Sequence, residues 1–150
     1  MLKSFWTDPL VRDQDIDDPR ATVLRRKIIE NKKFLKKIYE EWHKKVASSL
    51  PEGTGYALEI GAGAGNLKAQ VRNLLNSEVF VCPGIDLVLD GSQLPFKKGI
   101  LRGIVLINVL HHIPESPKFL KEAARCVKPG GTMVMVEPWV TPWSKLIYQR

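Results

Sequence analysis

One nine-residue segment, LEIGAGAGN at residues 58–66, limits the fold of this chain more than any other. An apolar run ends beside Glu59 and opens into glycines at alternate positions, Gly61, Gly63 and Gly65. Glycine lacks a Cβ and adopts positive φ without strain, so such a turn lets the backbone approach a ligand, next to the free amides of a following helix. The segment predicts a strand, a turn and a helix, which either hold a nucleotide-type ligand or form a tight connection only.

Short apolar runs alternate with helical patterns from residue 56 onward, which is typical of a parallel sheet with helices on its faces. We expect strands over residues 56–60, 73–77, 86–89, 104–108 and 132–137. We expect helices over residues 65–71 and 116–127, and a turn at residues 128–131. The fold class is therefore α/β, with a doubly wound and mostly parallel sheet.

A helical segment, residues 1–52, precedes the core of residues 53–150. Asp18 and Pro19 predict its start, because an acid at the N-cap and proline at the first helical position favour a helix. From there to Leu50 the apolar residues recur at steps of three, four or seven, so we expect one amphipathic helix. The apolar stripe consists of Leu24, Ile28, Leu35, Ile38, Trp42 and Val46.

The net charge of +7 is concentrated in this segment, where residues 25–45 contain nine Lys or Arg and three Glu. Such a surface attracts anionic substrates, nucleic acids or membranes, but a solvated helix face is the interpretation that we favour. No apolar run approaches the length of a membrane span, and the first residues do not resemble a signal peptide. We therefore expect a cytoplasmic protein.

The two cysteines, Cys82 and Cys126, lack the spacing of metal ligands. We expect neither a disulfide nor a metal site, and we expect Cys126 to be a small core residue of a helix.

Four motifs occur in order along the chain. They are the glycine turn at residues 59–65, the DGSQLPF segment at 90–96, the NVLHHI segment at 108–113 and the RCVKPGG segment at 125–131. Together they resemble class I S-adenosylmethionine-dependent methyltransferases. Within that class, they resemble a bacterial subgroup of proteins with a type 11 methyltransferase domain. The resemblance covers residues 57–137. It implies a Rossmann-like fold, S-adenosylmethionine as the cofactor, and methyl transfer to a small-molecule or lipid-like acceptor.

The resemblance also implies a cofactor site where the strand order reverses, between the first and fourth strands. Gly61, Ala62, Gly63 and Gly65 would lie against the methionine and ribose parts, while Glu59 would attract the ammonium group or cap loop amides. Glu78 would bind the ribose, with Asp86 as the alternative. Asp90, beside Gly91, would contact the adenine. Asn108 would lie near the methyl group.

His111 and His112 are the candidate catalytic residues. Methyl transfer depends chiefly on alignment and exclusion of water, so a general base is optional. If the acceptor is a hydroxyl, a histidine with a pKa near neutrality could take its proton. The alternative, and the more frequent case, is a hydrogen-bonded structural pair.

The resembling family has seven strands, and this chain provides for five. The last strand, residues 132–137, would then be an exposed apolar edge that invites pairing with another chain. We therefore expect either a C-terminally shortened fragment or a homodimer formed through this edge.

Three other functions compete with the methyltransferase hypothesis. A non-catalytic cofactor-binding or interaction domain would retain the same motifs. A nucleic-acid methyltransferase would use the basic segment, but we expect a small-molecule acceptor and no nucleic-acid partner. A nicotinamide-dependent oxidoreductase would need the turn G-x-G-x-x-G, and this chain has Asn66 in place of the last glycine.

Overall fold

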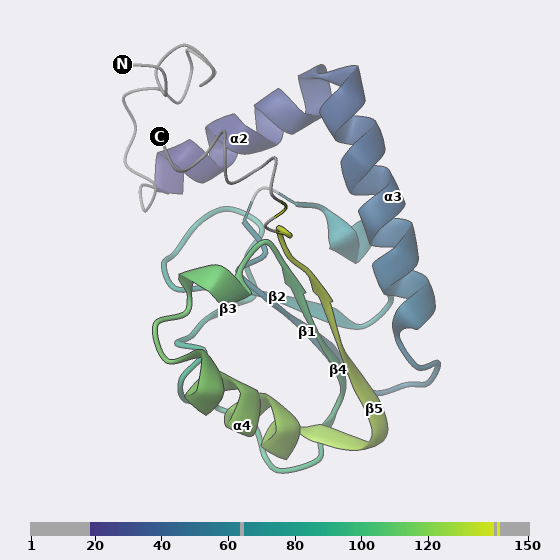
Figure 1. Cartoon of the computed structure of the whole chain (residues 1–150), viewed down its shortest axis with the longest axis vertical. Helices are drawn as coiled ribbons and strands as arrows, with labels where there is room; N and C mark the ends of the chain where they lie inside the picture. Colours follow the sequence, from purple (N-terminus) through teal and green to yellow (C-terminus); the bar gives the residue numbers. More distant parts are fainter. Residues whose placement is uncertain (1–18, 64, 140, 142–150) are drawn as a thin grey trace.

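The computed structural model describes residues 19–63, 65–139 and 141 (Figure 1). Two helices come first, α2 (Pro19–Asn31) and α3 (Lys33–Ser49). The sheet consists of β1 (Ala57–Ile60), β2 (Leu74–Glu78), β3 (Leu87–Val88), β4 (Leu101–Ile107) and β5 (Val127–Val136). The connections contain two short 3₁₀ helices, η1 (Leu67–Ala69) and η2 (Leu110–His112), and the helix α4 (Ser116–Cys126).

The sheet has the order β3-β2-β1-β4-β5, and each pair of neighbouring strands is parallel. The chain starts in the central strand β1, moves outward to β2 and β3, and then crosses to β4. The strand order therefore reverses between β1 and β4, where open parallel sheets bind their ligands. This topology confirms the predicted doubly wound, Rossmann-like α/β fold.

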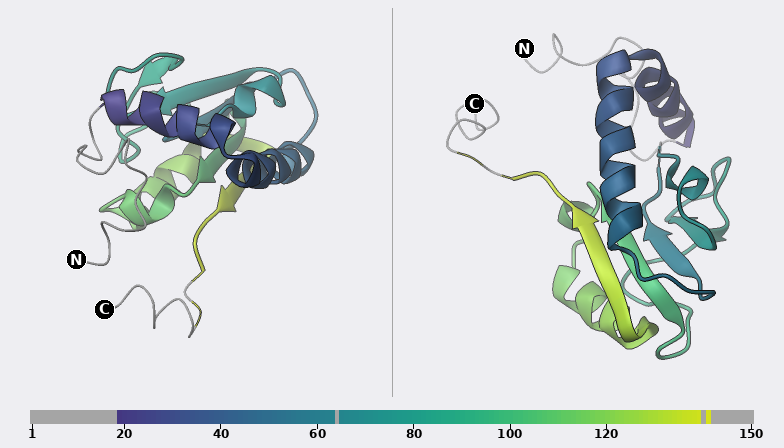
Figure 2. Two further views of the ribbon diagram at one scale, coloured as in Figure 1. Left: turned by 90° about the horizontal axis from the view of Figure 1, so that it is seen from above. Right: turned by 90° about the vertical axis from the view of Figure 1, so that its right-hand side faces the viewer.

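Two apolar layers cover the faces of the sheet, one beside α3 and the other beside α4. Figure 2 shows these two helices on either side of the strands. Leu58 and Ile104 face the layer of α4, where Phe119 is fully buried. Ala57 and Val105, one position away on the same strands, join the layer of α3. Side chains alternate between the faces of a strand, so runs that are apolar throughout match a sheet buried on both sides. Each fully buried large side chain contributes about 1.5–3 kcal/mol to folding.

From residue 19 onward, where the structure describes the N-terminal segment, it forms two helices, so the prediction of one continuous helix up to Leu50 is wrong. Lys32 is extended, with φ −91° and ψ 101°, and the chain turns sharply there (Figure 1). The turn lets α2 reach the carboxyl ends of the strands while α3 packs on the sheet. Within the stripe only Ile28 and Val46 are buried. The predicted N-cap, Asp18, lies outside the described residues.

Two local predictions also differ from the structure. Residues 65–71 do not form the expected helix, because only the single turn η1 is helical there. The expected turn at residues 128–131 is instead part of β5, which begins at Val127. Gly130, with φ +74°, lies within an irregularity of the β4–β5 pairing and absorbs the extra residues. The other strands and α4 occur within a few residues of their predicted positions.

The strand β5 is an edge of the described sheet, since it pairs only with β4. Met135 on this strand is 43% exposed. Cys126 is fully buried in α4, as expected. No helix in the described parts of the chain is long and apolar enough to cross a membrane.

Candidate functional site

A cavity of about 560 Å³ opens where the strand order reverses, at the carboxyl ends of β1 and β4. All nine residues that the sequence assigns to the cofactor border it, namely Glu59, Gly61, Ala62, Gly63, Gly65, Glu78, Asp90, Gly91 and Asn108. They come from four separate segments of the chain. The structure therefore brings the nine predicted cofactor residues together around a single space.

The glycine turn has the geometry for which glycine is suited at two positions. Gly61 has φ +60° and Gly63 has φ +48°. A Cβ on Gly61 would also lie 2.7 Å from Cγ2 of Val109. The turn is tied to β2 because the amide of Ala62 donates to the carbonyl of Ser77 at 2.9 Å. The path of the backbone here thus depends on both glycines and on β2.

Glu59 lies beneath this turn and is only 2% exposed. Within the described parts of the chain, its Oε2 has no hydrogen-bond partner. Burial, and after it the neighbouring charge of Glu78, raises the pKa of Glu59 to about 8. A buried carboxyl group without a partner is costly, so the cavity beside it favours a cationic group.

Of the two candidate ribose acids, Glu78 borders the cavity and Asp86 does not. Oε1 of Glu78 accepts the amide of Gly63 at 2.8 Å. Asp86 instead lies 2.7 Å from the ammonium of Lys68 and accepts the amide of Asn76 at 2.8 Å. The hydrogen bond from Lys68 is the main reason that the pKa of Asp86 is lowered.

Asp90 and Gly91 form another wall of the cavity. Oδ1 of Asp90 accepts the amide of Ser92 at 2.7 Å, and this hydrogen bond lowers the pKa of Asp90. A Cβ on Gly91 would lie 3.2 Å from Cδ2 of Phe119, so the absence of a side chain lets this loop approach α4 closely.

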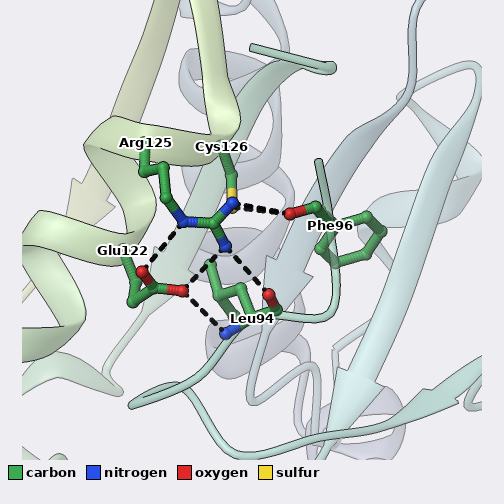
Figure 3. Close-up of polar contacts among 5 residues, drawn as sticks. All are labelled: Leu94, Phe96, Glu122, Arg125 and Cys126. Atoms are coloured by element: carbon green, nitrogen blue, oxygen red, sulfur yellow. Dashed lines mark hydrogen bonds and ion pairs between the residues drawn. The ribbon is translucent and has the colours of Figure 1, made fainter. Parts of the chain in front are cut away.

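An arginine network anchors the segment that follows Asp90 (Figure 3). Arg125 donates to the carbonyl of Phe96 at 2.7 Å and to that of Leu94 at 3.0 Å. It also pairs with Glu122 at 2.8 Å, and Glu122 accepts the amide of Leu94 at 3.2 Å. The second and fourth sequence motifs therefore meet in space, and their contact fixes residues 94–96, which follow Asp90 and Gly91 of the cavity wall.

The two candidate histidines lie side by side in the loop after β4, with ring centroids 4.0 Å apart, but they have different surroundings. His112 borders the cavity, whereas Nδ1 of His111 lies 2.7 Å from Oε2 of Glu137, outside the cavity. Oε1 of Glu137 also accepts the amides of Val109 and Leu110, at 2.9 and 2.8 Å. Glu137, at the end of β5, thus positions this loop.

Asn108 starts the same loop in a conformation that few residues other than glycine adopt, with φ +57°. Its amide donates to the carbonyl of Val136 at 2.7 Å. Asparagine is among the side chains that tolerate this region best, which suits it to the sharp turn from strand into loop.

Sequence reasoning named none of the four residues that the N-terminal helices contribute to the cavity wall: Thr22, Arg25, Tyr39 and His43. His43 is buried, and burial lowers its pKa and raises the pKa of Tyr39. Arg26 of α2 also donates to the carbonyl of Gly63 at 3.2 Å. One signal in the sequence could have pointed to Tyr39 and His43: positions 39, 43 and 46 lie on one face of the predicted helix.

Comparison with known proteins agrees with this geometry. Residues 32–147 match the model of a family described as a methyltransferase domain. No curated protein sequence matches the chain significantly.

Several solved structures share the fold. A protein from Methanococcus maripaludis, assigned as an S-adenosylmethionine-dependent methyltransferase, is 16% identical with a TM-score of 0.62, over 81% of this chain and 65% of that one. An S-adenosylmethionine-dependent methyltransferase from Aquifex aeolicus is 19% identical with a TM-score of 0.58, over 87% and 81%. A protein from Bacillus halodurans, assigned as a methyltransferase, is 22% identical with a TM-score of 0.55, over 72% and 51%.

The chain thus spans 65% of the Methanococcus protein and 51% of the Bacillus halodurans protein, and at these identities the likeness concerns the fold. The family match covers most of the chain and includes every residue around the cavity except those of α2. The chain therefore belongs to the methyltransferase-domain family, has the Rossmann-like fold of S-adenosylmethionine-dependent methyltransferases, and has S-adenosylmethionine as its implied cofactor.

Proposed function

We propose that this chain transfers a methyl group from S-adenosylmethionine to a small-molecule or lipid-like acceptor. The observation that carries the proposal is the convergence of the glycine turn, two glutamates and Asp90 on one cavity at the reversal of the strand order. The assignment to a bacterial subgroup stays a prediction.

The residues present fit this cofactor. The unpaired carboxyl group of Glu59 suits a cationic ammonium group, and the turn at Gly61 and Gly63 leaves room for close approach to the backbone. Glu78 would accept hydrogen bonds from the ribose hydroxyls, and Asp90 would contact the adenine amino group. When bound, the cofactor supplies a sulfonium methyl group, which an acceptor attacks in line as the carbon–sulfur bond breaks.

The protein would chiefly position the reactants and keep water away. The helices of the cap, residues 1–52 in the predicted division, contribute Tyr39 and His43 to one wall, while the loop of Asn108 contributes another. If the acceptor is a hydroxyl, we propose His112 rather than His111 as the base, because only His112 borders the cavity. His111 would position the loop through Glu137.

Calorimetric titration with S-adenosylhomocysteine tests the cofactor assignment. We expect saturable binding to the intact chain that weakens at least tenfold in Asp90→Ala, and Gln93→Ala, at an exposed position nearby, is the control. The absence of binding at millimolar ligand would overturn the proposal. Production of S-adenosylhomocysteine with a panel of hydroxyl, amine and lipid acceptors then separates an enzyme from a non-catalytic cofactor-binding domain.

A further inference from the structure

His43 is a buried group with unused hydrogen-bonding capacity at the candidate site. It is 6% exposed, and its Nε2 has no hydrogen-bond partner in the part of the chain that the structure describes. Among the described residues, four buried side-chain atoms are in this state: Arg26 Nε, His43 Nε2, Glu59 Oε2 and Asn76 Oδ1. Only His43 and Glu59 belong to residues that border the cavity. Because buried polar groups are nearly always satisfied, these two point to a ligand.

The two groups flank the same point of the glycine turn. A methyl group placed on Gly65 would lie 3.7 Å from Nε2 of His43 and 4.0 Å from Oε1 of Glu59. One group comes from the cap helix α3 and the other from the central strand β1. A ligand that lies against Gly65 would therefore meet both side chains.

Their chemistry is complementary to an α-amino acid. A carboxylate attracts an ammonium group, and an imidazole N–H donates to a carboxylate. Burial lowers the pKa of His43, an effect that Glu40 partly opposes, so the ring is a neutral donor when its proton is on Nε2. Arg25 also borders the cavity and adds a positive charge that favours an anion.

The ring of His43 is also held in place. Tyr39, one helical turn away, contacts it edge to face, with ring centroids 5.9 Å apart at 85°. A ring held by its neighbour loses little freedom when it binds, which strengthens recognition.

We propose that His43 binds the methionyl end of the cofactor, donating from Nε2 to its α-carboxylate while Glu59 pairs with the α-ammonium group. This inference rests on the proposed function and adds a cofactor-binding residue from the N-terminal cap. It also gives the cap a direct contact with the cofactor.

The test compares two ligands that differ only at the end that corresponds to the methionyl part of the cofactor. S-adenosylhomocysteine carries the α-amino acid, whereas 5′-methylthioadenosine lacks it. We expect His43→Leu to weaken binding of S-adenosylhomocysteine by about tenfold or more, as for loss of a hydrogen bond to a charged group. Binding of 5′-methylthioadenosine should change by less than about twofold. His43→Gln, which can place an amide N–H near the same point, should recover most of the affinity.

The control is Val46→Ala on the same helix, because Val46 is buried but does not border the cavity. It should lower the melting temperature without changing the ratio of the two affinities. If His43→Leu does not fold, His43→Asn and His43→Gln are compared instead. Only His43→Asn should lose the preference for S-adenosylhomocysteine over 5′-methylthioadenosine.

Three outcomes would overturn the inference: equal losses for both ligands, an unchanged affinity for S-adenosylhomocysteine, or a wild-type chain that binds both ligands equally. Failure of the wild-type chain to bind either ligand would instead overturn the proposed function, so the two failures are distinguishable.

Discussion

At the scale of single residues, Glu59 is a titratable group that burial removes almost completely from water. Its pKa is raised from the ordinary 4.5 of a glutamate to about 8, first by burial and then by Glu78. Between these two values the folded state holds a proton that the unfolded state has released. Stability from this group is therefore complete below pH 4.5 and is lost as the pH rises toward 8.

We expect Glu59→Gln to remove this pH dependence in the ligand-free protein. In the wild type, Glu59 should reduce the free energy of unfolding by about 1.4 kcal/mol per pH unit across the window. Urea denaturation at pH 5, 6, 7 and 8 measures the slope. Glu52→Gln, at an exposed glutamate, is the control and should keep the wild-type slope. Equal slopes in wild type and Glu59→Gln would contradict the assignment.

Gly61 allows a second prediction at this scale, because two separate effects oppose a side chain there. A residue other than glycine at φ +60° costs about 1–2 kcal/mol, and its Cβ would also lie 2.7 Å from Val109. Gly61→Ala should lower the melting temperature more than Gly130→Ala, whose site has φ +74° and no atom of a described residue within 4 Å of an added Cβ. Adding Val109→Ala to Gly61→Ala should reduce the difference. Equal effects of the two alanine variants would rule out the steric contribution.

At the scale of elements, the sheet and α4 could be predicted because they depend on local patterns. The apolar run at residues 104–107 of β4 predicts a strand buried on both faces, and Pro117 marks the start of α4. The break at Lys32 could not be predicted, because the apolar stripe continues through it. That break depends on α2 reaching the carboxyl ends of the strands, which is a tertiary effect.

The Arg125 network gives a testable prediction for the loop that follows Asp90. Arg125→Lys keeps the charge but cannot donate to Glu122 and to two carbonyl groups at once. We expect hydrogen exchange at the amide of Leu94, which donates to Glu122, to become several-fold faster. Arg72→Lys, at an exposed arginine, is the control, and unchanged exchange at Leu94 would contradict the role of the network.

At the scale of the whole molecule, the two edges of the sheet differ. β3 has two residues, whereas β5 has ten and exposes Met135. A long apolar edge strand favours pairing with another chain. The homodimer therefore stays a prediction for this edge.

We expect the wild type to dimerise in sedimentation velocity at micromolar concentrations and Met135→Lys to be monomeric. Val88→Lys, on the opposite edge and 52% exposed, introduces the same charge and should leave the dimer intact. A wild type that stays monomeric at all concentrations, or a dimer that only Val88→Lys disrupts, would contradict pairing through β5.

The sequence by itself determined the class of fold, the glycine turn and nine of the residues that border the cavity. These features depend on periodicity, turn chemistry and motifs, each of which lies within a few neighbouring residues. Only the tertiary structure decided that Glu78 rather than Asp86 borders the cavity, that His111 is held by Glu137, and that His43 reaches the site. Such outcomes depend on how segments distant in the chain pack together and on which buried groups remain without partners. Local sequence patterns predict neither of these features.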